Sequence, residues 1–361
     1  MHATLADSLD LLLPHLVPTL VRPDAISGLK ALAGRLVPIL RGGFECRLSA
    51  NQPQVDVQQC MVPDGHELAR LQASIASAAS GVEGTARQAW LSLQHFIAAW
   101  ADPLSLLHDN IPELWLEFDN DPASLGLMLP AVFFALPQEA SPATDTYKIA
   151  AQSLNLLLGL SGWCEWQNHL SRCFAACPDG VFVSHIGVML SRSAPALRVN
   201  VKRLQPDTLI PYLQYLGWPC ETNEVKALMK QLLTWADRIT VCLDVGQTLY
   251  PRLGFECIFL RQPQDDVHWA MLLDDLVKQE LCTSEKREAL LNWPGQTTPV
   301  NTPADWPEHL IIDSLLQPSS SFTTFNRCLS HIKVSWRPPH LLEAKGYLWF
   351  QHEWISGVGK R

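Results

Sequence analysis

Charged and polar side chains recur at every second position in several short stretches of this sequence. Three such stretches are Glu45-x-Arg47, Arg198-x-Asn200-x-Lys202 and Lys345-x-Tyr347. Alternate residues of a β-strand point to the same face of a sheet, so these side chains would share one face in extended segments. If that face encloses a cavity, its charges need counter-charges, water or a ligand, because an unpaired charge away from bulk water is costly. A cavity of this kind is a candidate functional site.

The stretches belong to five segments that each have the pattern of a β-hairpin. In each segment two runs rich in β-branched and aromatic residues flank a turn, for example Asn51-Gln52-Pro53 or Arg192-Ser193-Ala194-Pro195. The predicted hairpins lie near residues 44–60, 113–136, 183–202, 239–260 and 331–350. Segments with apolar residues at helical spacing lie before and between them. They predict helices at 9–20, 26–40 (ended by Gly42-Gly43), 67–100, 146–177, 222–235, 269–291 and 322–329.

Hairpins that alternate with helices predict an α/β (α+β) fold, in which ten antiparallel strands close into one barrel with the helices on the outside. Closure removes the exposed strand edges that an open sheet would have to protect. The outer strand face must then be apolar, and the polar alternate positions point into the lumen. We expect residues 1–361 to form a single domain. The alternative is an open sheet whose polar face meets solvent.

The inward-facing polar set supplies the candidate cavity. Its predicted lining residues include Trp115, Glu117, His185, Asp244, Glu256, His331 and Glu343. His185 and His331 could each act as a general base, because imidazole titrates near neutral pH, although a purely structural role is the alternative for both.

Composition restricts the partners and the compartment. A formal net charge of −9 argues against nucleic acid and anionic membranes as partners, because an acidic surface does not neutralise phosphate. The first residues lack the basic segment and cleavage site of a signal peptide, and the longest apolar runs are too short to span a bilayer. Ten scattered cysteines without a CxxC motif fit a reducing compartment, so we expect a cytoplasmic protein.

Motifs for metals and nucleotides are weak. His169, Cys173 and Cys177 would share a helical face and could hold zinc or copper, but buried cysteines on an amphipathic helix are the commoner explanation. Asp265-Asp266 and Asp274-Asp275 do not form a DDxxD motif. No P-loop, dinucleotide-binding or GxSxG motif occurs. We therefore expect no metal site and no cofactor.

The repeated order of hairpins and helices resembles the ABBA, or PT-barrel, prenyltransferase family. In that family a ten-stranded barrel holds a prenyl diphosphate and an aromatic acceptor, and the resemblance covers most of the chain. It implies basic residues for the leaving diphosphate, aromatic faces for the allyl cation, and a carboxylate that takes the acceptor's proton. These requirements can be matched to residues of this sequence.

On this resemblance Glu45 is the candidate catalytic carboxylate, and Trp115, Tyr347 and Trp349 are candidate aromatic walls. The candidate diphosphate-binding residues are Arg47, Arg198, Lys202, Lys333, Lys345 and Tyr347. The alternative for the basic residues is salt bridging to acids inside the barrel. The sequence departs from the family in having only five tyrosines and about as many acids as bases on the inward face.

The resemblance implies a metal-independent transferase that attaches an isoprenoid from a prenyl diphosphate to an aromatic group of a small molecule or peptide. The alternative is a non-catalytic barrel that binds a peptide or metabolite as an accessory protein in a biosynthetic pathway. An enzyme of another reaction class on the same barrel is a third possibility, because a fold does not fix its chemistry.

Overall fold

A computed structural model describes residues 4–38, 41–52, 54–63, 67–120, 129–138, 145–190, 196–219, 223–302, 305–316 and 321–356. The described strands form five antiparallel hairpins. They are β1 (Arg41–Arg47) with β2 (Val55–Met61), β3 (Leu114–Phe118) with β4 (Ala131–Ala135), β5 (Phe182–Met189) with β6 (Leu197–Lys202), β7 (Arg238–Val245) with β8 (Leu249–Ile258), and β10 (Ser321–Arg337) with β11 (His340–Ser356).

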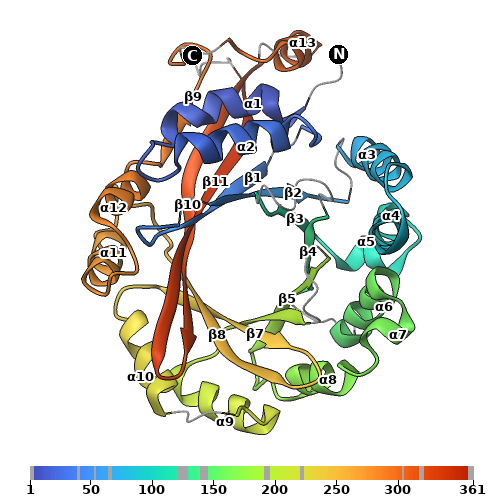
Figure 1. Ribbon diagram of the computed structural model, residues 1–361, viewed down its shortest axis with the longest axis vertical. Helices are drawn as coiled ribbons and strands as arrows, with labels where there is room; N and C mark the ends of the chain where they lie inside the picture. Colours follow the sequence, from blue (N-terminus) through green and yellow to red (C-terminus); the bar gives the residue numbers. More distant parts are fainter. Residues whose placement is uncertain are drawn as a thin grey trace.

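Neighbouring hairpins pair with each other and close a ring. The strand order is β11-β1-β2-β3-β4-β5-β6-β7-β8-β10, and β10 pairs with β11. The predicted closed barrel of ten antiparallel strands is therefore confirmed. Figure 1 shows the barrel from one open end, so that its strands form a ring. A short strand, β9 (Gly295–Thr297), adds to β10 beyond the ring. The expectation that residues 1–361 form a single domain stays a prediction.

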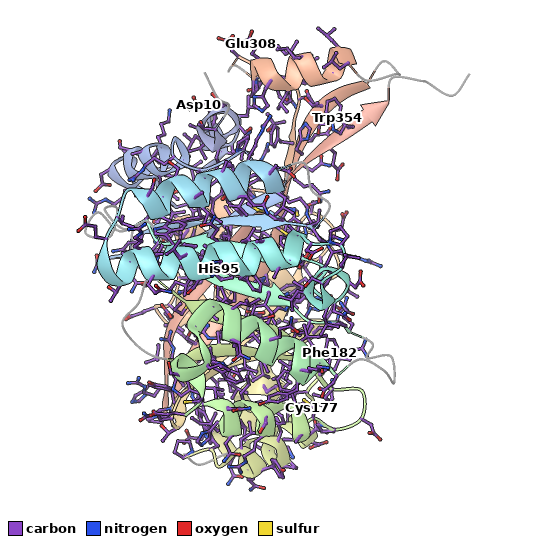
Figure 2. All side chains as sticks on the ribbon, turned by 90° about the vertical axis from the view of Figure 1, so that its right-hand side faces the viewer. Asp10, His95, Cys177, Phe182, Glu308 and Trp354 are labelled. Atoms are coloured by element: carbon purple, nitrogen blue, oxygen red, sulfur yellow. The ribbon has the colours of Figure 1, made fainter. Side chains whose placement is uncertain are left out.

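Helices surround the barrel (Figure 1). They are α1 (Leu5–Leu12), α2 (Pro23–Ala33), α3 (Leu68–Ser80), α4 (Gly84–Ala101), α5 (Leu106–Asn110), α6 (Thr146–Leu158), α7 (Leu160–Trp163), α8 (Gln167–Ala175), α9 (Pro206–Leu216), α10 (Asn223–Leu232), α11 (His268–Lys278), α12 (Ser284–Leu291) and α13 (Glu308–Leu316), with a 3₁₀ turn at Leu13–His15. In Figure 2, α4 with His95 lies on the outside, and Glu308 of α13 and Trp354 of β11 stand at one end of the molecule.

The hydrophobic core lies between the barrel wall and the helices. Outward residues such as Phe44, Val57 and Leu116 are buried against helical side chains such as Phe96 and Trp100. The alternation of the strands thus places apolar residues under the helices and leaves the opposite face to the lumen. No helix in the described ranges is both long and apolar enough to cross a membrane.

Several predicted element boundaries were wrong. Residues 322–329, expected to be helical, belong to β10, because pairing with both β11 and β9 overrides their helix-like apolar spacing. The Gly42-Gly43 pair does not end a helix but lies within β1. A Cβ atom on Gly43 would lie 2.6 Å from the carbonyl oxygen of Leu348, so glycine permits the close approach of β11. The predicted turn at 192–195 lies outside the described residues.

The predicted helices also differ in number. The segments 67–100, 146–177 and 269–291 are each divided into two or three helices, and α5, α9, α13 and β9 were not predicted. For α9 a signal exists, since Pro206 stands at its first turn and Gly217 ends it at a φ of 78°.

A buried lysine of α12 fixes the turn between β1 and β2. Lys286 is 4% exposed, and its Nζ donates to the carbonyl oxygens of Arg47 (2.7 Å), Ser49 (3.0 Å) and Gln52 (2.8 Å). These three hydrogen bonds, called here the Lys286 clamp, fix the end of β1 that carries Arg47. They also fix the turn at Ser49 and Gln52, and Gln52 borders the lumen.

We predict that Lys286→Met lowers the free energy of unfolding by about 1–3 kcal/mol, because it removes the buried ammonium that donates to three carbonyl oxygens. Urea denaturation measures the effect, with exposed Lys230→Met on α10 as the matched control. Equal stability of the two variants would contradict the proposed clamp.

Candidate active site in the barrel lumen

Two adjoining cavities occupy the described part of the lumen. The larger, about 580 Å³, is called here the polar cavity, and the smaller, about 260 Å³, the aromatic cavity. Both are lined by Glu117, Phe133, Lys333 and Tyr347, which therefore mark their boundary. Together they provide space typical of small-molecule sites.

The polar cavity collects most of the predicted anion-binding residues. Its charged and phenolic lining consists of Glu45, Arg47, Asp56, Glu117, Asp119, Arg198, Arg252, Lys333, Glu343, Lys345 and Tyr347. The aromatic cavity holds the others. Its lining includes Glu113, Trp115, His185, Lys202, Glu256, His331 and Trp349. Asp244 lines neither of these cavities, and instead pairs with Arg198 from the neighbouring strand.

Strand register explains why these side chains meet. Glu45 of β1 lies opposite Tyr347 of β11 on one side and opposite Asp56 of β2 on the other. Gln58, two residues beyond Asp56, lies opposite Glu117 of β3. Because opposed residues of antiparallel strands point to the same face, the pairing brings three carboxyl groups and a phenol into one layer of the lumen.

Glu45 is the most buried carboxyl of this layer after Asp56. It is 3% exposed, its Oε1 lies 2.6 Å from the Nζ of Lys345, and its Oε2 accepts a hydrogen bond from the Tyr347 hydroxyl. Burial raises its pKa, but the charge and hydrogen bond of Lys345 and the hydrogen bond of Tyr347 outweigh burial and lower the pKa to about 2. Glu45 is therefore a carboxylate at neutral pH.

Each of the five basic side chains described in the polar cavity is paired with a carboxylate. The pairs are Arg47–Asp56 (3.0 Å), Arg198–Asp244 (2.5 Å), Lys333–Glu256 (3.3 Å), Lys345–Glu45 (2.6 Å) and Arg252–Glu343. Lys202, in the aromatic cavity, has no ion pair with a described residue. These ion pairs are the salt bridging that was the alternative role for the basic residues, and an anionic ligand would have to compete with the paired acids.

Two carboxyl groups of the polar cavity have raised pKa values and therefore bind a proton more readily than usual. Burial and the nearby charges of Glu45 and Asp56 raise the pKa of Glu117 to about 7. Burial and the charge of Glu45 raise the pKa of Asp56 to about 6. Like charges close together in a buried layer disfavour each other's ionisation. Protonation of these two groups would lower the negative charge that an anionic ligand meets.

This shift predicts a pH-dependent stability. Glu117 keeps its proton up to about pH 7 when folded but only to its ordinary value of 4.5 when unfolded, so the stability it contributes below pH 4.5 is lost as the pH rises towards and past 7. We expect Glu117→Gln to raise the free energy of unfolding by roughly 1–3 kcal/mol at pH 8 and to change it little at pH 4. Urea denaturation at both pH values, with exposed Glu280→Gln as the control, measures this difference. A variant equally destabilised at both values would contradict the assignment.

The aromatic cavity is built by stacked rings. His331 lies over Tyr347 with ring centroids 4.1 Å apart and planes 18° apart, and Trp115 meets Trp349 edge to face at 5.3 Å. Burial lowers the pKa of His331 to about 4, so its ring is neutral at pH 7. The Nε2 atom of His331 has no hydrogen-bond partner among the described residues. Neutral π faces of this kind can stabilise a carbocation.

His185 belongs to a second polar cluster in the lining of the aromatic cavity. Its Nε2 lies 3.8 Å from Oε1 of Glu113, and that oxygen also accepts a hydrogen bond from the Trp115 indole at 3.1 Å. The interaction with His185 is the main cause that lowers the pKa of Glu113 to about 2. His185 therefore has a carboxylate neighbour that can orient it.

The sequence-based selection of candidate site residues omitted Arg252 and Phe133. The predicted second strand of the 239–260 hairpin begins only at Gly254, so Arg252 is left outside it, although its i, i+2, i+4 spacing with Gly254 and Glu256 is a usable signal. Phe133 lies in a nearly continuous apolar run, where alternation gives no indication of the inward face. Its ring occupies the space beside Gly187, where an added Cβ would lie 2.4 Å from it.

The structure also bears on the possible metal ligands. Within the described ranges no group of three His, Cys, Asp or Glu side chains could hold a metal ion. Cys177 lies just beyond the end of α8, so it does not share the helical face of His169 and Cys173 as the sequence predicts. Its Sγ donates to the carbonyl oxygen of Cys173 at 3.2 Å.

Comparisons with known proteins identify the fold. No known family model and no curated protein matches the sequence. Among solved structures, prenyltransferase PriB in its apo form matches with a TM-score of 0.53 and 12% identity, over 97% of this chain and 96% of that chain. The 6-dimethylallyltryptophan synthase from Micromonospora olivasterospora, in complex with DMASPP and Trp, matches with a TM-score of 0.53 and 12% identity, over 96% of this chain and 97% of that chain.

These relatives are ABBA prenyltransferases, and the likeness extends along nearly the whole of both chains. The chain therefore has the PT-barrel fold, and the resemblance predicted from its hairpins is confirmed at the level of fold. At this identity the likeness assigns no substrate and no residue roles.

Proposed function

We propose that the protein transfers an isoprenoid from a prenyl diphosphate to an aromatic group of a small molecule or peptide. One observation carries the proposal: a cavity with five basic side chains adjoins a cavity walled by aromatic rings, and a buried carboxylate stands beside their boundary. A reaction that separates a diphosphate from an allyl cation needs these three environments within one substrate length. The solved relatives, which include a complex with a donor analogue and Trp, support the same reaction class.

The proposed reaction begins with the donor in the polar cavity. Arg47, Arg198 and Lys345 donate to the diphosphate oxygens. Lys333, at the boundary between the two cavities, donates to the oxygen that joins the diphosphate to the isoprenoid. These charge-assisted hydrogen bonds stabilise the negative charge that grows as the carbon–oxygen bond of the donor breaks. Tyr347, stacked on neutral His331, presents an aromatic face to the allyl cation that forms.

The acceptor then attacks from the aromatic cavity, where Trp115, Trp349 and Phe133 hold its ring. A carbon–carbon bond forms between the acceptor ring and the allyl carbon, and the ring carries the positive charge. The ring proton passes to Glu45, whose Oε2 already accepts a hydrogen bond from Tyr347 at the boundary. A carboxylate with a low pKa suffices here, because the protonated ring is itself a strong acid. Diphosphate and the prenylated product then leave.

The direct test is incubation of the purified protein with dimethylallyl or geranyl diphosphate and a panel of indoles, phenols and aromatic peptides. Mass spectrometry should detect a product heavier by one isoprenoid, together with released diphosphate. Calorimetry with a non-reactive thiolodiphosphate donor analogue measures binding separately from turnover. Absence of both product and donor binding would overturn the proposal.

A second candidate is a non-catalytic barrel that binds a peptide or metabolite. The pairing of every described basic side chain in the polar cavity with an acid favours it, because such a site is already neutralised. This candidate predicts that calorimetry finds no diphosphate binding, and that no prenylated product forms with any acceptor of the panel. Product formation that depends on Lys333 would exclude it.

A further inference from the structure

One side of the aromatic cavity is polar. Asn200 and Lys202 of β6 and Thr240 of β7 line it, and these three residues are called here the polar wall. The register places Lys202 directly opposite Thr240, and Asn200 lies two residues before Lys202, so the three side chains share one face of the sheet. Figure 1 shows β7 across the ring from β3, whose Trp115 supplies one of the aromatic rings of the same cavity.

Two buried oxygen atoms of the polar wall have no hydrogen-bond partner among the described residues. They are Oδ1 of Asn200, a residue that is 8% exposed, and Oγ1 of Thr240, which is 1% exposed. Nδ2 of Asn200 donates to Oε1 of Glu256 at 3.5 Å, which leaves Oδ1 as the atom that lacks a donor. Buried polar groups of native proteins nearly always have a partner. A ligand in this cavity can supply both partners.

The polar wall also carries a positive charge. Lys202 has no ion pair within the described ranges, since the acids of the lumen pair with other basic residues. Glu256, the acid opposite Thr240 on β8, is already engaged. Its Oε1 accepts from Lys333 at 3.3 Å and from Cys242 at 3.2 Å. The wall therefore attracts an anionic group, whereas a cationic group would meet the like charge of Lys202.

We propose that the acceptor is an aromatic acid with a neutral hydrogen-bond donor on the carbon next to its carboxylate, as in a 2-hydroxy acid, and that the polar wall binds this end. The carboxylate accepts from Nζ of Lys202 and from the hydroxyl of Thr240, and the neutral donor bonds to Oδ1 of Asn200. One small molecule can reach all three, because residues i and i+2 of a strand lie only about 7 Å apart.

This inference rests on the prenyl transfer proposed above, which places the acceptor ring against the aromatic side chains of the same cavity. It assigns Lys202 to the acceptor, whereas the family resemblance implies a role in diphosphate binding. The described basic residues of the polar cavity remain for the diphosphate. Donor and acceptor would then each have their own cationic partners, in adjoining cavities.

The test uses three indoles that differ only in the group on the carbon next to the carboxylate. Indole-3-lactate has a hydroxyl there, indole-3-propionate a hydrogen and L-tryptophan an ammonium. Calorimetry measures their binding with and without the thiolodiphosphate donor analogue. Indole-3-lactate should bind about threefold to tenfold more tightly than indole-3-propionate, the value of one neutral hydrogen bond. L-Tryptophan should bind at least about threefold more weakly than indole-3-lactate, because its ammonium lies near Lys202.

Variants of the polar wall assign these differences to residues. Asn200→Leu should make the affinities for indole-3-lactate and indole-3-propionate equal. Lys202→Met should weaken binding of both acids about 10- to 100-fold, the value of a hydrogen bond to a charged group, and should leave the affinity for the donor analogue unchanged. Exposed Lys230→Met is the matched control. Thr240→Val, which is nearly isosteric, should weaken both acids about threefold to tenfold and serves if Asn200→Leu does not fold, as judged by circular dichroism.

Three results would overturn the inference. They are equal binding of indole-3-lactate and indole-3-propionate to the wild type, a preference for the lactate that survives Asn200→Leu, and a loss of donor-analogue affinity in Lys202→Met. Failure of the proposed prenyl transfer looks different. In that case the donor analogue does not bind, while binding of the three indoles in the expected order still supports the polar wall as a site for aromatic acids.

Discussion

Replacing Glu45 by Gln is expected to lower kcat/KM for prenyl transfer by about 10²- to 10⁴-fold, the usual contribution of a positioned proton acceptor. The amide keeps the size of the side chain and can still accept the hydrogen bond of Tyr347, but it cannot take the acceptor's proton. It also leaves Lys345 without its carboxylate partner at 2.6 Å. Lys345 would still have the carboxylate of Glu343 at 4.0 Å. Without the nearer carboxylate its ammonium would hold the diphosphate more tightly, so donor affinity should stay equal or increase while turnover falls.

This separation of binding from turnover makes the Glu45 experiment specific. Calorimetry with the thiolodiphosphate analogue reports donor affinity, and single-turnover mass spectrometry reports the chemical step. Glu288→Gln is the matched control, since Glu288 pairs with Arg287 on the outside of α12 and should leave both quantities unchanged. A Glu45→Gln variant that retains full turnover would show that another group accepts the proton.

The sequence specified the barrel better than it specified the site. Alternation in Glu45-x-Arg47 and Lys345-x-Tyr347 correctly predicted inward residues on β1 and β11, because a strand period of two leaves no choice once one face is apolar. The opposition of Glu45 to Tyr347 joins residues 302 positions apart, and only the pairing of the first hairpin with the last creates it. No pattern within a short stretch of sequence indicates how β1 and β11 are aligned.

The errors have physical causes of the same kind. Residues 322–329 have helical apolar spacing, yet backbone pairing on both sides makes them strand. Phe133 has apolar neighbours on both sides, so neither face of β4 is distinguished. Individual ion pairs such as Lys333–Glu256 depend on distances across the lumen, which residue types alone do not determine. Sequence patterns therefore predict most of the lumen charges, with Arg252 missed, and the fold determines which of them neutralise each other.

Opposite effects are expected from removing the two partners of the Lys333–Glu256 pair. Both side chains are largely buried, and Nζ lies 3.3 Å from Oε1. Lys333→Met should weaken binding of the donor analogue at least about 30-fold, since truncating one partner of a buried charge pair typically costs 2 kcal/mol or more. Glu256→Gln should strengthen binding roughly tenfold, because it frees the ammonium while the amide can still accept the hydrogen bond from Cys242.

The sign of the Glu256→Gln effect distinguishes the two proposed functions. If the lumen binds a diphosphate, each acid that occupies a basic side chain is a competitor, and neutralising it must raise donor affinity. If the charges only hold the barrel together, Glu256→Gln and Lys333→Met should both lower thermal stability, and neither should create diphosphate binding. Lys226→Met is the control for the lysine, because Lys226 pairs with Asp207 at 2.7 Å outside the barrel. Calorimetry and thermal unfolding of the same four proteins measure both consequences.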